Sequence, residues 1–259
     1  MHKPIVIATL LCCLAAPVGA ADKPEALLQR MQTWLEPAQP STRRLTMTIR
    51  SGGETVSWTA GQARGPIDGG RAVLTVLLEP GDLRGTALLM RQQKGKPPEQ
   101  WLYLPYLRRV RKVMPVDEFE SFLNTEFTYS DLGFLNLADR TVSSLWPANI
   151  DGIAVMQLQE VPKDRDTFSR IVSFVVPATG QPLKREYYDV ANRLWKVATF
   201  ENVATIHELP TAQRIRMEDV QTGFGSEMRA TDIAFSLPVP PALFDPAQLS
   251  KAADASIWQ

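Results

Sequence analysis

RLTMTIRSGGETVSWTA, residues 44–60, alternates apolar and polar side chains on both sides of a Ser-Gly-Gly sequence. The alternation runs through residues 44–50 and again through residues 54–60. A period of two indicates a β-strand with one buried face. Gly52 and Gly53 are typical of the tight turn that joins two antiparallel strands. The stretch therefore predicts a β-hairpin.

Further strands are expected on the C-terminal side of this hairpin, at short spacing and separated by turns rich in Gly and Pro. They are expected at residues 72–78, 86–92, 101–104, 107–113, 153–161, 170–176, 183–189, 194–206, 213–219 and 225–235. Residues 22–35 instead predict an amphipathic helix, which Asp22 can cap. Residues 115–147 lack the alternation and are expected to be helical or irregular. We therefore expect an α+β fold, a strongly curved antiparallel half-barrel of about 11 strands with helices covering its concave apolar face.

The N-terminus, residues 1–21, has the features of a secretory signal peptide. Lys3 supplies a positive charge, an apolar run follows, and Ala20 and Ala21 are suitable for cleavage. The residue before each of Cys12 and Cys13 is unsuited to lipidation, so no lipid anchor is expected. We therefore expect a soluble protein secreted to the periplasm, with residues 22–259 forming a single domain and acting as a monomer.

Removal of the leader leaves few groups that commonly catalyse reactions or bind metals. Both cysteines would be lost, and His207 would be the only histidine. A metal site or a catalytic triad would depend on that residue alone, and it is more simply read as a strand end. No enzyme activity, cofactor or metal is expected, although paired carboxylates stay open as an alternative. The formal net charge of zero argues against a nucleic-acid partner.

Three sequence motifs resemble the outer-membrane lipoprotein-sorting (LolA-like) family, in particular the branch associated with RND-type exporters. They are WLYLPYLRRVRKV at 101–113, ESFLNTEFTYSDL at 120–132, and DIAFSL at 232–237 followed by Leu243-Phe244. The resemblance implies an open half-barrel whose helices close over an apolar cavity. It also implies a domain that binds lipids or lipid-modified proteins. It does not identify the cargo, the membrane partner or the direction of transport.

The inward faces of the first strands are the candidate lining of such a cavity. Met side chains among them would suit variable cargo. The alternative is that the same residues form an ordinary core. The candidate ligand-binding residues are Leu45, Met47, Ile49, Val56, Trp58, Leu74, Val76, Leu88 and Met90.

The densest group of aromatic residues falls in the stretch without strand character and is the candidate lid of the cavity. A plug that never opens would have the same sequence. The candidate lid residues are Phe119, Phe122, Leu123, Phe127 and Tyr129, with Phe134 and Leu135 behind them.

Arg108, Arg109, Arg111 and Lys112 place four positive charges within five residues of an otherwise neutral chain. They could dock an acidic partner or lipid phosphates. A solvated strand face, balanced by nearby acidic residues, explains them equally simply. In a strand, Arg109 and Arg111 would share one face with Val113, so the charge would divide between both faces.

Two functions follow from these observations. The first is a periplasmic carrier that shelters the acyl chains of a lipid or lipoprotein and moves them between membranes, with an RND-type transporter as a candidate partner. Sheltering is needed because each exposed CH₂ costs about 0.8 kcal/mol in water. The alternative is a periplasmic sensor or adaptor that recognises a lipid or lipoprotein and signals to a membrane protein.

Overall fold

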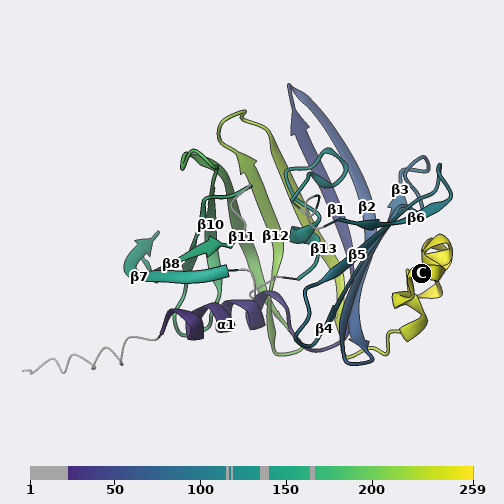
Figure 1. Ribbon diagram of the computed structural model, residues 1–259, viewed down its shortest axis with the longest axis horizontal. Coiled ribbons are helices and arrows are strands. Elements are labelled where there is room, and N and C mark those ends of the chain that lie inside the picture. The colour runs from purple at the N-terminus through teal and green to yellow at the C-terminus, as the bar shows by residue number, and fades with distance from the viewer. Residues whose placement is uncertain (1–22, 115–116, 118, 135–139, 164–166, 259) are drawn as a thin grey trace, which may run out of the picture.

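The structure is a computed structural model that describes residues 23–114, 117, 119–134, 140–163 and 167–258. The leader expected at residues 1–21 lies outside the described residues, as does Leu135. Within the described part, all strands join one antiparallel sheet in the order β6-β5-β4-β3-β2-β1-β13-β12-β11-β10-β9-β8-β7. The sheet is open, with β6 and β7 at its two edges, and it curves strongly (Figure 1). The expected α+β fold with a curved antiparallel sheet is confirmed.

The strands have the following bounds. They are β1 Ser41–Ser51, β2 Glu54–Ile67, β3 Gly70–Glu79, β4 Ala87–Gln93, β5 Glu99–Leu104, β6 Arg109–Val113, β7 Arg140–Ile150, β8 Ile153–Pro162, β9 Arg170–Val175, β10 Pro182–Tyr188, β11 Leu194–Ile206, β12 Leu209–Asp219 and β13 Gly225–Phe235.

Two expectations about the strands were wrong. The described residues form a sheet of 13 strands rather than about 11, and most of β7, residues 140–147, lies in the stretch that was expected to be helical or irregular. Pro147 lies within β7. Proline is tolerated there because β7 is an edge strand, where one row of backbone N–H groups has no ladder partner.

Helix α1, Pro24–Leu35, covers one end of the concave face. Its N-cap is Lys23, which makes no side-chain capping bond, so the helix begins two residues later than expected. Pro24 fits the first turn because its missing N–H would have no helical partner. The buried side of α1, with Leu27, Leu28 and Met31, packs against Leu158 of β8 and Val175 of β9.

The convex face of β2, β3 and β4 is covered by the C-terminal segment. It consists of three short 3-10 helices, η5 Pro241–Phe244, η6 Pro246–Asp254 and η7 Ser256–Trp258. In Figure 1 the segment is the yellow one beside β2–β5. Leu249 and Phe244 pack there against Leu74, Val76 and Leu89. Helical segments therefore cover both faces of the sheet, rather than the concave face alone.

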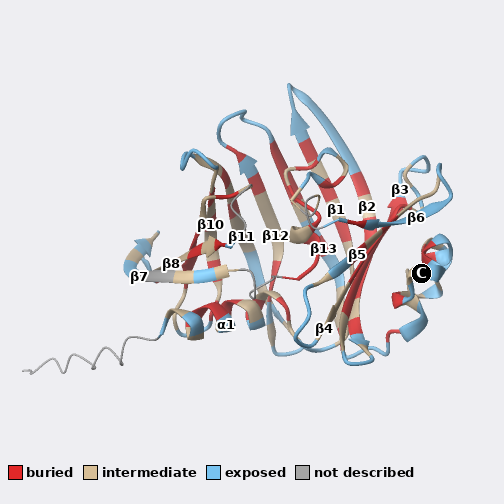
Figure 2. Cartoon of the chain, viewed as in Figure 1, coloured by how far each residue is buried: buried red, intermediate tan, exposed pale blue. Residues whose placement is uncertain are grey.

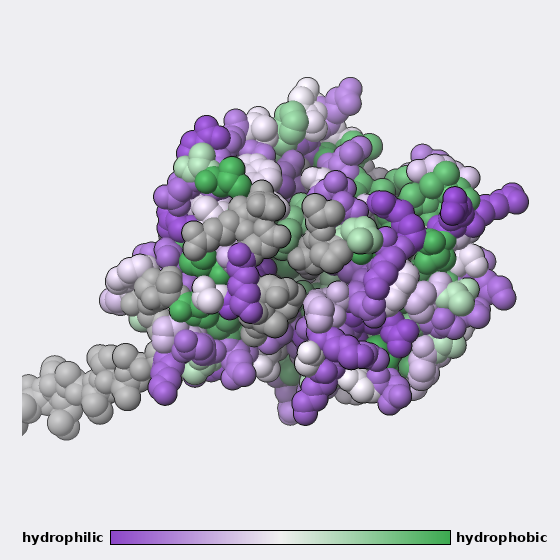
Figure 3. Space-filling view, viewed as in Figure 1, coloured by the Kyte–Doolittle hydropathy of each residue, from purple (hydrophilic) through white to green (hydrophobic). Residues whose placement is uncertain are grey.

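Buried residues run along the middle of the central strands, and exposed residues lie at the strand ends (Figure 2). The face seen in Figure 3 is mainly hydrophilic, with smaller apolar patches. Among the described residues, no helix is long and apolar enough to cross a membrane.

Candidate functional site

The concave face of β1 to β5 carries a buried apolar cluster. The register fixes which residues share this face, because Met47 lies opposite both Trp58 of β2 and Met228 of β13. Residues 119–134, here called the lid segment, cover the side of this cluster that faces away from the sheet. From the sheet, its buried members include Leu45, Met47, Ile49, Trp58, Ala60, Leu77, Leu88 and Leu102.

The lid segment packs on this cluster through aromatic rings. Phe122 meets Trp58 edge to face, with ring centroids 5.9 Å apart, and Phe122 meets Tyr129 at 5.5 Å. Phe122 is fully buried. The segment contains only two short 3-10 helices, η2 Phe122–Asn124 and η3 Ser130–Leu132, and one isolated bridge within itself. It can therefore leave the sheet without breaking any strand pairing of the sheet.

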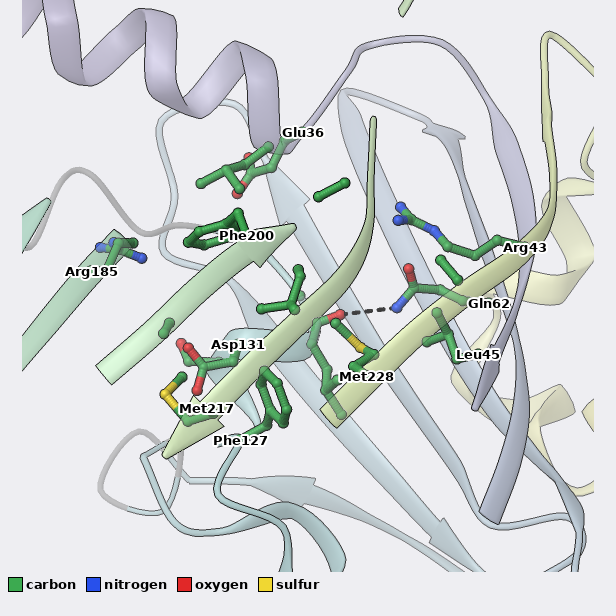
Figure 4. Close-up of a pocket in the computed structure, with 18 of the residues that line it drawn as sticks. Glu36, Arg43, Leu45, Gln62, Phe127, Asp131, Arg185, Phe200, Met217 and Met228 are labelled. Atoms are coloured by element: carbon green, nitrogen blue, oxygen red, sulfur yellow. Dashed lines mark hydrogen bonds between the residues drawn. The ribbon is translucent and has the colours of Figure 1, made fainter. Parts of the chain in front are cut away.

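Polar bonds also attach the lid segment to the sheet. Lys196 Nζ, on β11, lies 2.9 Å from Glu126 Oε2 and donates to the Glu126 carbonyl oxygen. The Glu126 backbone N–H donates to Ser226 Oγ on β13. Gln62 Nε2, on β2, donates to the Leu132 carbonyl oxygen (Figure 4).

A cavity of about 110 Å³ lies between the lid segment, the end of α1 and the concave face. Figure 4 shows Phe127, Met217 and Met228 around it, with Arg43 and Gln62 extending from neighbouring strands. This volume holds about four water molecules. Pockets that hold drug-sized ligands measure roughly 300–1,000 Å³, so a long acyl chain does not fit while the lid segment is in this position.

A buried ionic network lies beside the cavity. Glu160 of β8 is fully buried, with Arg185 Nη2 at 3.1 Å and Arg140 Nη1 at 2.8 Å from its carboxylate oxygens. Ser173 Oγ donates to the same carboxylate. Burial acts to raise the pKa of Glu160, but Arg185 and Arg140 outweigh it and hold the pKa below the ordinary value. Burial raises the pKa of Tyr187, which Arg185 also contacts, to about 12.

The structure brings five of the nine candidate lining residues together under the lid segment: Leu45, Met47, Ile49, Trp58 and Leu88. Met90 lies on the same face but contacts Val73 and Phe134.

Besides Met90, three further candidate lining residues are not part of this cluster, and each placement is a correction. Leu74 and Val76 belong to the convex face, since Val73, Thr75 and Leu77 are the inward residues of β3. All of residues 72–78 are apolar except Thr75, so alternation does not reveal the inward side. Val56 is 60% exposed near the tip of the first hairpin.

All five candidate lid residues lie in the lid segment, which begins at Phe119. Phe122, Phe127 and Tyr129 are buried, and Phe119 and Leu123 pack against the same cluster while partly exposed. Whether the segment opens was not decided by the sequence, and it stays a proposal.

The basic run lies at the β6 edge of the sheet and in the turn before it. Arg109 to Lys112 form exposed positions of β6, and Arg108 precedes the strand with a positive φ of 48°. Lys112 pairs with Glu99. The charge divides between both faces, as expected, because Arg111 lies opposite Leu102 whereas Lys112 lies opposite Trp101.

Sequence reasoning missed the charged residues of the concave face. Arg43 and Arg64 line the cavity, and Glu160, Arg185 and Lys196 lie buried around it. A signal was available for Arg43, because it continues the inward positions of Leu45, Met47 and Ile49 by one further step. An inward arginine in an otherwise apolar series marks a polar group at the rim of a cavity.

His207 is exposed in the turn between β11 and β12, with a φ of 46°. Its expected place at a strand end is confirmed. Within the described ranges, no group of three or more His, Cys, Asp or Glu side chains is arranged to hold a metal ion.

A family model described as an uncharacterized protein matches residues 69–251, more than half of the chain. The search of curated proteins finds no match.

Solved structures are similar to nearly the whole described chain. A domain described as an outer membrane lipoprotein-sorting protein, from Vibrio parahaemolyticus, is 26% identical with a TM-score of 0.81, and the match covers 88% of this chain and 100% of that one. A DUF1329 family protein from Desulfovibrio piger is 24% identical with a TM-score of 0.79, covering 87% and 97%. A LolA superfamily protein from Nitrosomonas europaea is 20% identical with a TM-score of 0.71, covering 87% and 98%. The last two show the shared fold alone.

Proposed function

The chain belongs to the family of uncharacterized proteins whose model matches residues 69–251, and from this premise we propose that it is a periplasmic carrier of lipid or lipoprotein acyl chains. The cargo chains occupy the concave apolar face after the lid segment moves aside. The proposal agrees with the 26% identical Vibrio domain, which is described as lipoprotein-sorting.

The observation that carries this proposal is the combination of a rigid apolar face with a weakly structured cover. The strands beneath the lid segment are paired on both sides along the sheet, so the apolar surface keeps its shape when the cover leaves. The cover is attached by side-chain contacts and a few hydrogen bonds, without a strand ladder to the sheet. A lid of this kind exchanges cargo without unfolding of the sheet.

The energy of transfer supports the same function. A chain of 14 methylenes exposed to water costs on the order of 11 kcal/mol, at about 0.8 kcal/mol per CH₂. The aromatic and aliphatic side chains under the lid segment offer surface that replaces this water contact. Met47, Met217 and Met228 lie on that face and can adapt to chains of different shape.

The location and the partner belong to the proposal as well. A leader at residues 1–21 would deliver the chain to the periplasm, where we propose that it acts as a monomer. The exposed basic residues of β6, Arg109, Arg111 and Lys112, together with Arg108, form a surface suited to an acidic partner. We propose an inner-membrane RND-type transporter as that partner.

Native mass spectrometry of the protein purified gently from periplasm tests the carrier function. Co-purifying lipid that exchanges into vesicles is the expected result. Lipid retained tightly without exchange would instead indicate the sensor or adaptor function. Met47→Asp and Trp58→Glu should abolish lipid binding, and Arg44→Gln on the opposite face of the same strand is the matched control. The carrier proposal fails if no lipid is found and the two variants behave like wild type in cells.

A further inference from the structure

Arg43 and Arg64 place two guanidinium groups beside each other at the rim of the cavity. Arg43 of β1 lies opposite Gln62 of β2, and Ser41 lies opposite Arg64. Both arginines are therefore on the concave face and on adjacent strands. Arg64 lies diagonally across from Arg43, because it is two residues beyond Gln62 in β2. Figure 4 shows the Arg43 guanidinium extending into the space between Gln62 and Glu36.

Neither guanidinium forms an ion pair within the described part of the chain, although the nearby Glu36 carboxylate acts to raise the pKa of Arg64. No hydrogen bond or ion pair among the described residues involves either guanidinium, and Arg64 Nε and Nη1 are buried without a partner. Burial, reinforced by the charge of Arg64, lowers the pKa of Arg43 to about 9, which leaves it charged at neutral pH. Burial also lowers the pKa of Arg64. Buried donors without partners are rare in native proteins and usually mark a place for a ligand, ion or water.

The acidic groups nearby are already engaged. The Glu36 carboxylate lies 2.7 Å from Arg71 Nη2, so its charge is shared with a third arginine. Asp131 lines the cavity but accepts hydrogen bonds from the Thr128 backbone N–H and hydroxyl, within the lid segment. When the lid segment opens, Asp131 moves away with it and the positive charge of the rim increases.

An open groove adjoins the cavity at this rim, and Glu36 and Arg64 line both. The volume of the groove is about 810 Å³. Arg71, Lys94 and Lys96 also line the groove. One carboxylate, Glu36, lines the groove beside these four cationic side chains, so the groove has a positive excess and is open to solvent. Apolar residues of the concave face line the cavity on the other side of Arg64.

We propose that Arg43 and Arg64 bind the phosphate of a lipid head group, and that the cargo of this carrier is a phosphate-bearing lipid. The phosphate lies between the two guanidinium groups, the rest of the head group occupies the groove, and the acyl chains pass under the lid segment. Guanidinium groups match phosphate through paired charge-assisted hydrogen bonds. A lipoprotein anchored through diacylglyceryl carries no phosphate and would leave both arginines without a partner. This inference rests on the proposed carrier function and selects one class of cargo within it.

The test compares two lipids that differ only in phosphate. Fluorescent dimyristoyl phosphatidic acid and the matching dimyristoyl glycerol are each offered to the protein in phosphate-free vesicles of digalactosyl diacylglycerol. Wild type should bind phosphatidic acid more tightly than dimyristoyl glycerol. Each arginine should contribute about tenfold to this difference in affinity, which is the gain that a charge-assisted hydrogen bond provides. Arg43→Gln/Arg64→Gln should lose that preference and keep the affinity for dimyristoyl glycerol. Arg43→Lys/Arg64→Lys should retain part of the preference, and Arg44→Gln should match wild type.

The outcomes separate this inference from the carrier function. Equal binding of both lipids by wild type, or an unchanged preference in the double Gln variant, overturns the phosphate site while the carrier function stands. Binding of neither lipid overturns the carrier function. Inorganic phosphate alone is the third probe: if it binds as tightly as phosphatidic acid, the site serves a free anion and the lipid assignment is wrong. Thermal unfolding of each variant shows that a lost preference does not arise from loss of the fold.

Discussion

Lys196 of β11 binds Glu126 of the lid segment twice, through the side-chain carboxylate at 2.9 Å and through the backbone carbonyl oxygen at 2.9 Å. Both side chains are largely withdrawn from water, with 5% and 15% of their surfaces exposed. One lysine therefore makes two of the polar contacts that attach the lid segment, which has no strand pairing with the sheet, to the concave face. The strength of this attachment sets how easily the cover moves.

Replacing Lys196 by Met should loosen the lid segment. The variant leaves Glu126 without its cation, and breaking a buried ion pair costs about 3–5 kcal/mol. Hydrogen exchange should show faster opening of residues 122–134, and vesicle assays should show faster lipid exchange. Lys184→Met is the control, because Lys184 pairs with Glu186 in a more exposed position. Unchanged exchange in the Lys196 variant would mean that this pair does not hold the lid.

Gly61 should be intolerant of any side chain. A Cβ at this position would overlap the indole ring of Trp258, whose Nε1 donates to the Ala252 carbonyl oxygen. Gly61→Ala should displace the C-terminal segment from the convex face and cost about 1–3 kcal/mol. Tryptophan fluorescence and proteolysis of the C-terminal segment report the change. Gly81→Ala, where a Cβ meets nothing, should behave as wild type, and equal behaviour of the two variants would contradict the packing described.

Glu160 should make stability depend on acid pH. Its pKa is held below the ordinary value of 4.5 in the folded chain, so its contribution is present above pH 4.5 and is lost as the pH falls toward the folded value. Glu160→Gln should flatten this acid limb of the stability curve. It should also cost about 3–5 kcal/mol at neutral pH, because Arg185 and Arg140 lose their counter-charge.

Denaturant unfolding between pH 3 and 7 measures both effects. Glu218→Gln is the matched control, since Glu218 is exposed and its Oε1 lies 3.9 Å from Arg50 Nη2, at the long end of an ion pair. This control should change stability by about 0.5 kcal/mol or less. An acid limb that is as steep in the Glu160 variant as in wild type would show that another group titrates.

Sequence patterns predicted the regular parts of the fold. Strict alternation in residues 44–60 indicated the hairpin and the inward set Leu45, Met47 and Ile49, which the structure confirms. In β3 the same logic failed, because both faces are buried: one by the lid segment, the other by the C-terminal segment. When both faces are apolar, only pairing with the neighbouring strands decides which residues point inward.

The charged part of the site was beyond sequence reasoning for a different reason. Glu160 and Arg185 lie 25 residues apart and meet only because β8, β9 and β10 pair in a defined register. Arg43 and Arg64 come together in the same way across β1 and β2. Apart from Arg43, whose inward position continues the alternation of β1, the burial of these residues cannot be inferred from spacing along the chain. The aromatic cover was recognisable because its residues are close together in the chain.

A reversible lock on the lid segment tests the central claim most directly. The backbone N–H of Glu126 donates to Ser226 Oγ at 2.9 Å, so Glu126→Cys/Ser226→Cys is the pair to test for a disulfide between the lid segment and β13. Fluorescent lipid transfer between vesicles is measured on the same protein, oxidised and then reduced. The account predicts that transfer stops in the oxidised protein and returns on reduction. Equal transfer in both states would show that acyl chains do not pass beneath the lid segment.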